Sequence, residues 1–250
     1  MSVVLLPVET CKALEGIMAK LWWKTGSSTT RSITWMRWGR MCRHKHAGGL
    51  GFQSFHDFNL SLLGKQGWQL LTNESSLIGK VFKARYYPNG TFLDARLGNN
   101  PNFVWGSVHE AQSIVRAGAR RTVGDGFTIS ILHDPWLPCP VNPYVHSDHP
   151  GLQDKTVHSL FRLDDKVWDM EIINDLFSAR DRALITSIQL SSNNHSDCWS
   201  WRFENSGLFT VKSAYRFLEN LKYDWVGDDN TSFWRKMWTL KIPPKVSNFI

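Results

Sequence analysis

Apolar residues recur every three or four positions through much of the chain, which is the spacing that places them on one face of a helix. In the first half this pattern predicts four helices, over residues 7–23, 55–71, 75–86 and 103–116. Pro7 suits a helix start, and Gly118 suits a position just past a helix end. The polar run 26–30 indicates a linker, and the aromatic stretch 33–42 predicts one or two helical turns. The glycine-rich segment 44–52 predicts a loop.

Alternation of apolar and polar residues further along predicts two β-hairpins. The first pairs residues 120–123 with 127–132 across the turn Gly124-Asp125-Gly126. The second pairs residues 198–203 with 208–211 across a short polar turn that ends in glycine. Each strand is brief, so we expect the sheet content to be small.

The second half otherwise shows short helical patterns, at residues 157–161, 170–177, 179–188, 213–221 and 232–240. The first three surround Trp168. Residues 138–155 are rich in proline, histidine and aspartate, which is typical of a linker. The fold class that follows is α+β, mainly helical with two β-hairpins, and the linker allows two small subdomains.

Charge is unevenly distributed over the 250 residues, whose formal net charge is +7. Residues 1–125 hold 16 Lys and Arg against 7 Asp and Glu, whereas residues 126–250 hold 13 against 15. A basic half predicts a surface that binds RNA or DNA through its phosphates, without sequence preference. The candidate contacts are Lys65, Lys80, Lys83, Arg85, Arg116, Arg120 and Arg121. The alternative is that these are ordinary surface cations paired with neighbouring acids.

Several classes of site are not expected. The four cysteines are far apart, and Cys42, His44 and His46 lack the spacing of a zinc site, so we expect neither a metal nor another cofactor. Asp164-Asp165 and Asp228-Asp229 do not follow the aromatic residue that precedes the polymerase Asp-Asp pair. No phosphate-loop, dinucleotide-binding or hydrolase motif occurs, so the sequence predicts a protein that is not an enzyme.

Targeting signals are also missing from the sequence. The start lacks a basic region ahead of its apolar run, which Pro7 interrupts, so a signal peptide is not expected. No apolar stretch is long enough to cross a membrane. Nucleus or cytoplasm is therefore the expected location, and a membrane is not an expected partner.

Ordered blocks of the chain resemble plant LINE-type (non-LTR) retrotransposon polyproteins. The segment LPVETCKALEGIMAKLWW resembles the helix that closes the thumb-like end of the reverse transcriptase. The blocks that match the region downstream are ITWMRWGRMCRHKHAGGLGFQSFHDFNLSLLGKQGWQLL, KVFKARYYPNGTFLDARLGNNPNFVWGSV, RRTVGDGFTISILHDPWLP, SWRFENSGLFTVKSAYRFLE and WRKMWTLKIPPKVSNFI. Gln53 and Gln69 stand where the family usually has arginine, and Gly64 stands where it has alanine. These departures fit a diverging or decaying copy.

The resemblance implies a division of the chain. Residues 1–30 would be the end of the reverse-transcriptase thumb-like region, 31–137 a basic helical connector with the first hairpin, and 138–156 a linker. Residues 157–250 would form a small α+β region that ends in the first half of a reverse-transcriptase zinc-binding-like domain. The zinc ligands and the ribonuclease H carboxylates of the family would lie beyond Ile250.

The function that this implies is that of a non-catalytic fragment of a retrotransposon reverse transcriptase polyprotein. At most it would bind RNA or DNA without sequence preference, and the remainder of the polyprotein would be a partner if the reading frame extends. Two alternatives remain open: a decayed reading frame with no selected activity, and a host-adopted protein-interaction module.

Overall fold

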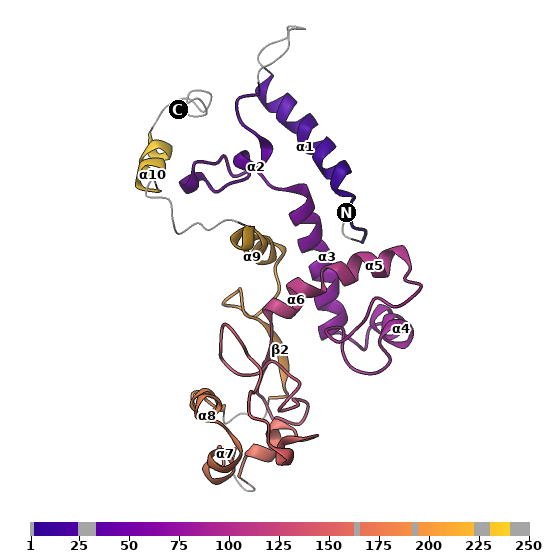
Figure 1. The fold of residues 1–250 in the computed structure, drawn as a ribbon, viewed down its shortest axis with the longest axis vertical. Coiled ribbons are helices and arrows are strands. Elements are labelled where there is room, and N and C mark those ends of the chain that lie inside the picture. The colour runs from indigo at the N-terminus through magenta and orange to yellow at the C-terminus, as the bar shows by residue number, and fades with distance from the viewer. Residues whose placement is uncertain (1–2, 25–33, 163–165, 192–194, 223–230, 241–250) are drawn as a thin grey trace. The chain divides into compact units, whose positions relative to one another are not determined.

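A computed structural model describes residues 3–24, 34–162, 166–191, 195–222 and 231–240 (Figure 1). The fold is α+β and mainly helical, as the sequence predicts. The chain divides into two compact units. Unit 1 contains Met1–Ile114 and Thr210–Ile250, and unit 2 contains Val115–Phe209. The predicted linker 26–30, both Asp-Asp pairs and the end of the last block, 241–250, lie outside the described residues.

Unit 1 is built on helix α3 (Phe55–Thr72), which contacts helices from both ends of the chain. Its helical partners are α1 (Val8–Trp23), α4 (Leu77–Tyr86), α5 (Phe103–Glu110) and α9 (Val211–Lys222). Two short segments, α2 (Trp38–Met41) and the 3-10 turn η1 (Lys45–Ala47), precede α3, and α10 (Thr231–Thr239) contacts η1. Figure 1 shows α9 beside the N-terminal part of α3.

Side-chain caps explain why the helices of unit 1 begin where they do. The Ser54 hydroxyl accepts from the Asp57 N–H at the start of α3, and Ser76 accepts from Gly79 N–H at the start of α4. Asn102 caps α5 in the same way. The helix predicted over 103–116 is divided at Ala111 into α5 and α6 (Gln112–Gly118).

Unit 2 has an apolar core around Trp168, with Ile131, Leu152 and Ile173 almost fully buried. It contains α7 (Met170–Leu176), α8 (Ala179–Thr186), and the 3-10 turns η2 (Pro150–Leu152) and η3 (Val157–Leu160). Strand β1 (Ala119–Thr122) pairs antiparallel with β2 (Cys198–Trp201), and Ala119 lies opposite Trp201.

The prediction of the first hairpin is wrong, because β1 pairs with β2 and residues 127–132 form no strand. The reason is the Asp197 carboxylate, which accepts from the backbone N–H groups of Gly124, Gly126 and Thr128, each at 2.8 Å. These contacts bend the Gly-Asp-Gly segment around an acidic side chain. The N–H groups are therefore not aligned for a hairpin ladder.

The prediction of the second hairpin is also wrong, since residues 208–211 form no strand. The N–H of Trp201 donates to Gly207 O, but the chain then enters α9 instead of continuing beside β2. The Thr210 hydroxyl accepts from the Ser213 N–H at 3.1 Å, which is a helix N-cap contact. This cap favours the helical turn over an extended strand.

Residues 138–155 do not form a linker, because they lie within unit 2. Leu152 is 1% exposed, and the N–H groups of His146 and Ser147 donate to the buried Asp181 carboxylate at 2.9 and 2.8 Å. A segment without regular hydrogen bonding is thus ordered by side-chain acceptors. Across the described ranges, no helix is both long and apolar enough to cross a bilayer.

Candidate functional site

The predicted phosphate contacts of unit 1 lie on α3 and α4. Lys65, Lys80 and Arg85 are exposed, and Lys65 and Lys80 form no ion pair within the described part of the chain. Lys83 is different, because its ammonium is paired with the carboxylate of Glu74. The alternative of an ordinary paired surface cation therefore applies to Lys83, while the other side chains are available to an anion.

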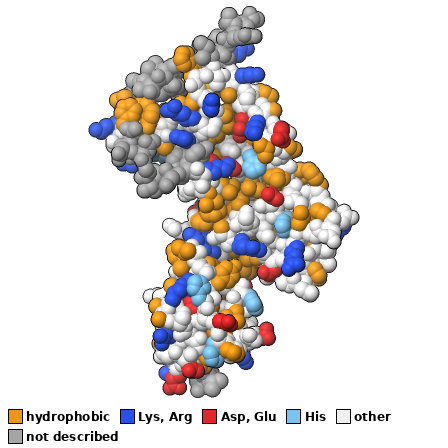
Figure 2. All heavy atoms as spheres, in the orientation of Figure 1, with side chains coloured by type: hydrophobic (Ala, Val, Ile, Leu, Met, Phe, Trp, Pro, Cys, Tyr) orange, Lys and Arg blue, Asp and Glu red, His pale blue; other side chains and the backbone are white. Residues whose placement is uncertain are grey.

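The remaining predicted contacts, Arg116, Arg120 and Arg121, belong to unit 2. Arg116 is exposed on the last turn of α6. Arg120 and Arg121 lie on β1, where they line a cavity of about 480 Å³ together with Arg202 and Cys139. Among the described residues that line this cavity, none is Asp or Glu. That the cations of both units form one phosphate-binding surface stays a prediction. Figure 2 shows Lys and Arg side chains scattered over the face in view.

The guanidinium of Arg120 is half-buried and donates to the carbonyl oxygens of Ala117 and Ala119, at 3.2 and 2.6 Å. Burial, and next the positive charge of Arg202, lower the pKa of Arg120 to about 10. Arg120 and Arg202 thus share with Arg121 a concave site whose described lining residues include no Asp or Glu. A phosphate or other anion would relieve this repulsion.

Arg121 has a structural role beside its place in the cavity. Its Nη2 donates to the carbonyl oxygen of Thr128 at 3.0 Å, and its guanidinium lies 4.9 Å from the centre of the Trp199 ring. The Arg121 side chain therefore joins β1 both to β2 and to the loop that follows β1. Its buried Nε–H has no acceptor among the described residues.

Sequence reasoning missed Asp197 and Arg202, which complete this region. Burial alone would raise the pKa of Asp197, but hydrogen bonds from Thr128, Gly124 and Gly126 lower it below its usual value. Asp197 thereby fixes the chain directly after β1. No local pattern marks either residue, because both are brought to β1 by the long-range pairing with β2.

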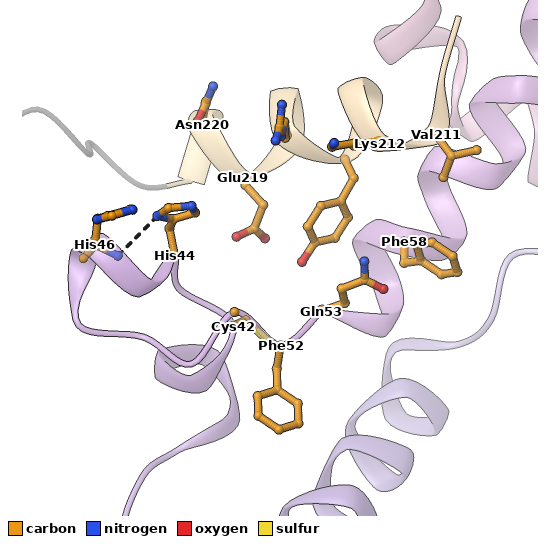
Figure 3. Close-up of a pocket in the computed structure, with 14 residues that line it drawn as sticks. Cys42, His44, His46, Phe52, Gln53, Phe58, Val211, Lys212, Glu219 and Asn220 are labelled. Carbon is orange, nitrogen blue, oxygen red and sulfur yellow. Dashed lines mark hydrogen bonds between the residues drawn. The ribbon is translucent and has the colours of Figure 1, made fainter. Parts of the chain in front are cut away.

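Unit 1 contains a second cavity, of about 770 Å³, between α9 and the segment 42–53 that leads into α3 (Figure 3). Its apolar and aromatic lining comes from Phe52, Phe58, Val211 and Tyr215. Figure 3 shows Glu219 pointing from α9 towards the segment that carries Cys42, with His44 beside it. Lys212 and Arg216 of α9 also line the cavity, and both are exposed.

His44 is held in one tautomer by the backbone N–H of His46. Its Nδ1 accepts from the His46 N–H at 3.2 Å, so the neutral ring carries its proton on Nε2 (Figure 3). Burial, followed by the charges of His46 and Arg216, lowers the pKa of His44. The neutral ring is thus favoured, and it offers an N–H donor.

Two buried carboxyl groups lie at this cavity: Glu219 lines it, and Asp57 is hydrogen-bonded to Glu219. Asp57 is 2% exposed and accepts from Lys222 Nζ at 2.6 Å on both oxygens. Glu219 is bonded to Asp57 and to the Tyr215 hydroxyl, and that hydroxyl accepts from the Ser54 N–H at 2.9 Å. Burial, and next the charge of Asp57, raise the pKa of Glu219. The network joins α9 to the start of α3.

The Cys42 thiol lies in surroundings that disfavour its ionised form. Burial raises the pKa of the Cys42 thiol to about 12, which disfavours the thiolate that a metal requires. Among the described residues, no group of three or more His, Cys, Asp or Glu side chains is placed to hold a metal ion. The arrangement suits binding of an anionic ligand with an apolar part.

The chain is similar to two proteins of Arabidopsis thaliana. It is 30% identical over 128 residues to Uncharacterized mitochondrial protein AtMg00310, an alignment that covers 51% of this chain and 82% of that protein. Over its full length it is 27% identical to Putative ribonuclease H protein At1g65750, of which it covers 41%. The chain therefore spans less than half of this longer relative. No family model matches the chain, and no solved structure matches it.

Proposed function

We propose that this chain, which belongs to the family of the Arabidopsis mitochondrial protein AtMg00310, derives from a plant LINE-type retrotransposon polyprotein. Its full length is also similar to part of a longer protein that is named a putative ribonuclease H protein. The region would lie between the reverse transcriptase and its zinc-binding domain. The ordered blocks at 33–71, 80–108, 120–138 and 200–219 support this placement.

The activity we propose is sequence-independent binding of RNA or DNA without catalysis. The observation that carries it is the cavity of unit 2, in which Arg120, Arg121 and Arg202 meet with no acid among the described lining residues. Guanidinium groups bind phosphate with paired, charge-assisted hydrogen bonds. Lys65, Lys80, Arg85 and Arg116 would add contacts along a strand, each to a phosphate rather than to a base.

Salt dependence tests this proposal. Binding of a fluorescent single strand would be measured by anisotropy at a series of salt concentrations. We expect affinity to fall steeply with salt, with each phosphate contact contributing about 0.7 to the logarithmic slope. In the Arg202→Gln variant the slope should decrease by roughly one such contact. Arg162→Gln is the matched control, since Arg162 is an exposed arginine of unit 2 outside the cavity.

The two results have distinct meanings. Equal loss in both variants would show that only net charge matters and that the cavity is not a phosphate site. Absence of binding at low salt would refute nucleic-acid binding altogether.

A second candidate function, binding the remainder of a polyprotein, is favoured by helix α1. Leu14, Ile17, Met18 and Leu21 lie at helical spacing, and all are exposed, Leu21 by 67%. The resemblance of α1 to the helix that closes the thumb-like end suggests the preceding reverse transcriptase region as the partner. Co-purification with that region, lost in Leu21→Lys, would support this function. Aggregation with binding of an apolar dye, and no complex, would instead favour a decayed frame.

A further inference from the structure

The cavity of unit 1 combines features that the phosphate contacts do not use. Its volume of about 770 Å³ lies in the range of sites that enclose small organic ligands. Phe58, Val211 and Tyr215 line it and are each only partly buried, so they leave apolar surface uncovered. A ligand with a flat apolar body would cover that surface.

Electrostatics at the mouth of the cavity favour an anion. Lys212 and Arg216 are exposed there and form no ion pair within the described residues. Of the nearby carboxyl groups, Asp57 is already paired with Lys222, and Glu219 is buried and hydrogen-bonded to Tyr215 and Asp57. The Nε2–H of His44 adds a neutral donor.

We propose that this cavity takes up one unstacked base of a single-stranded nucleic acid, while Lys212 and Arg216 hold the adjoining phosphates. The inference rests on the proposed nucleic-acid binding and adds to it a contact with a base. A base within a duplex is stacked and paired, whereas an unpaired base can enter a pocket lined by aromatic and apolar side chains. Because such packing is tolerant of base identity, the site adds affinity without reading sequence.

A strand with a single abasic position separates this contact from phosphate binding. The abasic strand keeps every phosphate and lacks the base, so only a site that accepts the base distinguishes it from the intact strand. Strands short enough to occupy one site would be compared by anisotropy, in matched DNA and RNA forms. We expect the intact strand to bind at least about fivefold more tightly than the abasic strand.

Filling the cavity should abolish that difference. Gln53 is exposed at the end of the segment 42–53 that leads into α3, and Figure 3 shows its side chain pointing into the space below α9. In Gln53→Trp the indole would occupy the cavity, and the intact and abasic strands should bind equally. Gln69→Trp is the matched control, because Gln69 is an exposed glutamine of α3 that does not line the cavity.

A second variant, Arg216→Gln, tests the proposal in case Gln53→Trp does not fold. Arg216→Gln changes an exposed rim residue and should weaken the intact and abasic strands by the same factor. Equal affinity of the wild-type protein for the two strands would overturn the base site while leaving phosphate binding intact. A difference that persists in Gln53→Trp would also overturn it.

Free adenosine monophosphate gives an independent readout. It should shift the His44 ring signals in the NMR spectrum of the wild-type protein and leave them unchanged in Gln53→Trp. Unchanged signals in the wild-type protein would count against the site even if strands bind elsewhere. If no strand binds at all, the proposed function fails, and the nucleotide titration alone decides whether the cavity holds a base.

Discussion

Replacing Asp197 by alanine should open the segment from Gly124 to Thr128, which follows β1, before the rest of unit 2 unfolds. The carboxylate accepts from the N–H groups of Gly124, Gly126 and Thr128, and also from the Thr128 hydroxyl at 2.9 Å. Gly124 and Gly126 are buried, so water cannot replace their lost acceptor, whereas Thr128 is exposed. At roughly 1.5 kcal/mol for each of the two buried donors, the loss is about 3 kcal/mol.

Amide hydrogen exchange measures this loss locally. A cost of about 3 kcal/mol should speed exchange at Gly124 and Gly126 on the order of 100-fold. The matched control is Asp148→Ala, which removes an exposed carboxylate that forms no hydrogen bond within the described residues. Exchange in Asp197→Ala that matches the wild-type protein within a factor of about two would refute the reasoning.

The same contact predicts a dependence on pH. The pKa of Asp197 is lower in the folded state than its usual value of 3.8, so the folded state binds fewer protons. The stabilisation is complete above 3.8 and is lost as the pH falls through the folded pKa. The wild-type protein and Asp197→Ala should therefore converge in stability in strong acid, and a constant difference would contradict this origin.

Two further perturbations test the packing and the buried charges. In Gly118→Ala the new Cβ would lie 2.1 Å from the buried Trp201 ring, so thermal unfolding should show a loss of about 1–3 kcal/mol, whereas Gly106→Ala, with no atom in reach, should be neutral or slightly stabilising. In Glu219→Gln the amide can still donate to Asp57 without a charge. Because the pKa of Glu219 is raised above 4.5, wild-type stability should fall as pH rises above that value, and urea unfolding should show a smaller fall in the variant.

The helices of this protein could be predicted because their determinants are local. The apolar spacing of α1 and α3 and the caps at Ser54 and Ser76 lie within one or two turns of the residues that they order. The predicted ends of these helices differ from the observed ends by no more than a few residues. The backbone hydrogen bonds of a helix join residues four positions apart, so the local sequence contains most of the information needed to predict it.

The sheet could not be predicted in the same way. The Gly-Asp-Gly segment satisfies every local rule for a hairpin, yet its N–H groups bond to a carboxylate about 70 positions away in the sequence. Strand pairing depends on which backbone and side-chain partners the fold brings together. Here β2 pairs with β1, and Asp197 binds the segment after β1, in place of the predicted pairing with residues 127–132. The predicted linker failed for a related reason, since Asp181 orders it from α8.

The candidate sites, too, combine features that follow from the local sequence with features that depend on long-range contacts. The sequence by itself determined the mainly helical fold, the basic first half, and the presence of Arg120 and Arg121 on a short strand. Only the tertiary structure decided that Arg202 joins them, that Lys83 is neutralised by Glu74, and that His44 lies in one cavity with Arg216. Charge and periodicity are properties of neighbouring residues, whereas a cavity and its field arise from chain segments that meet only after folding.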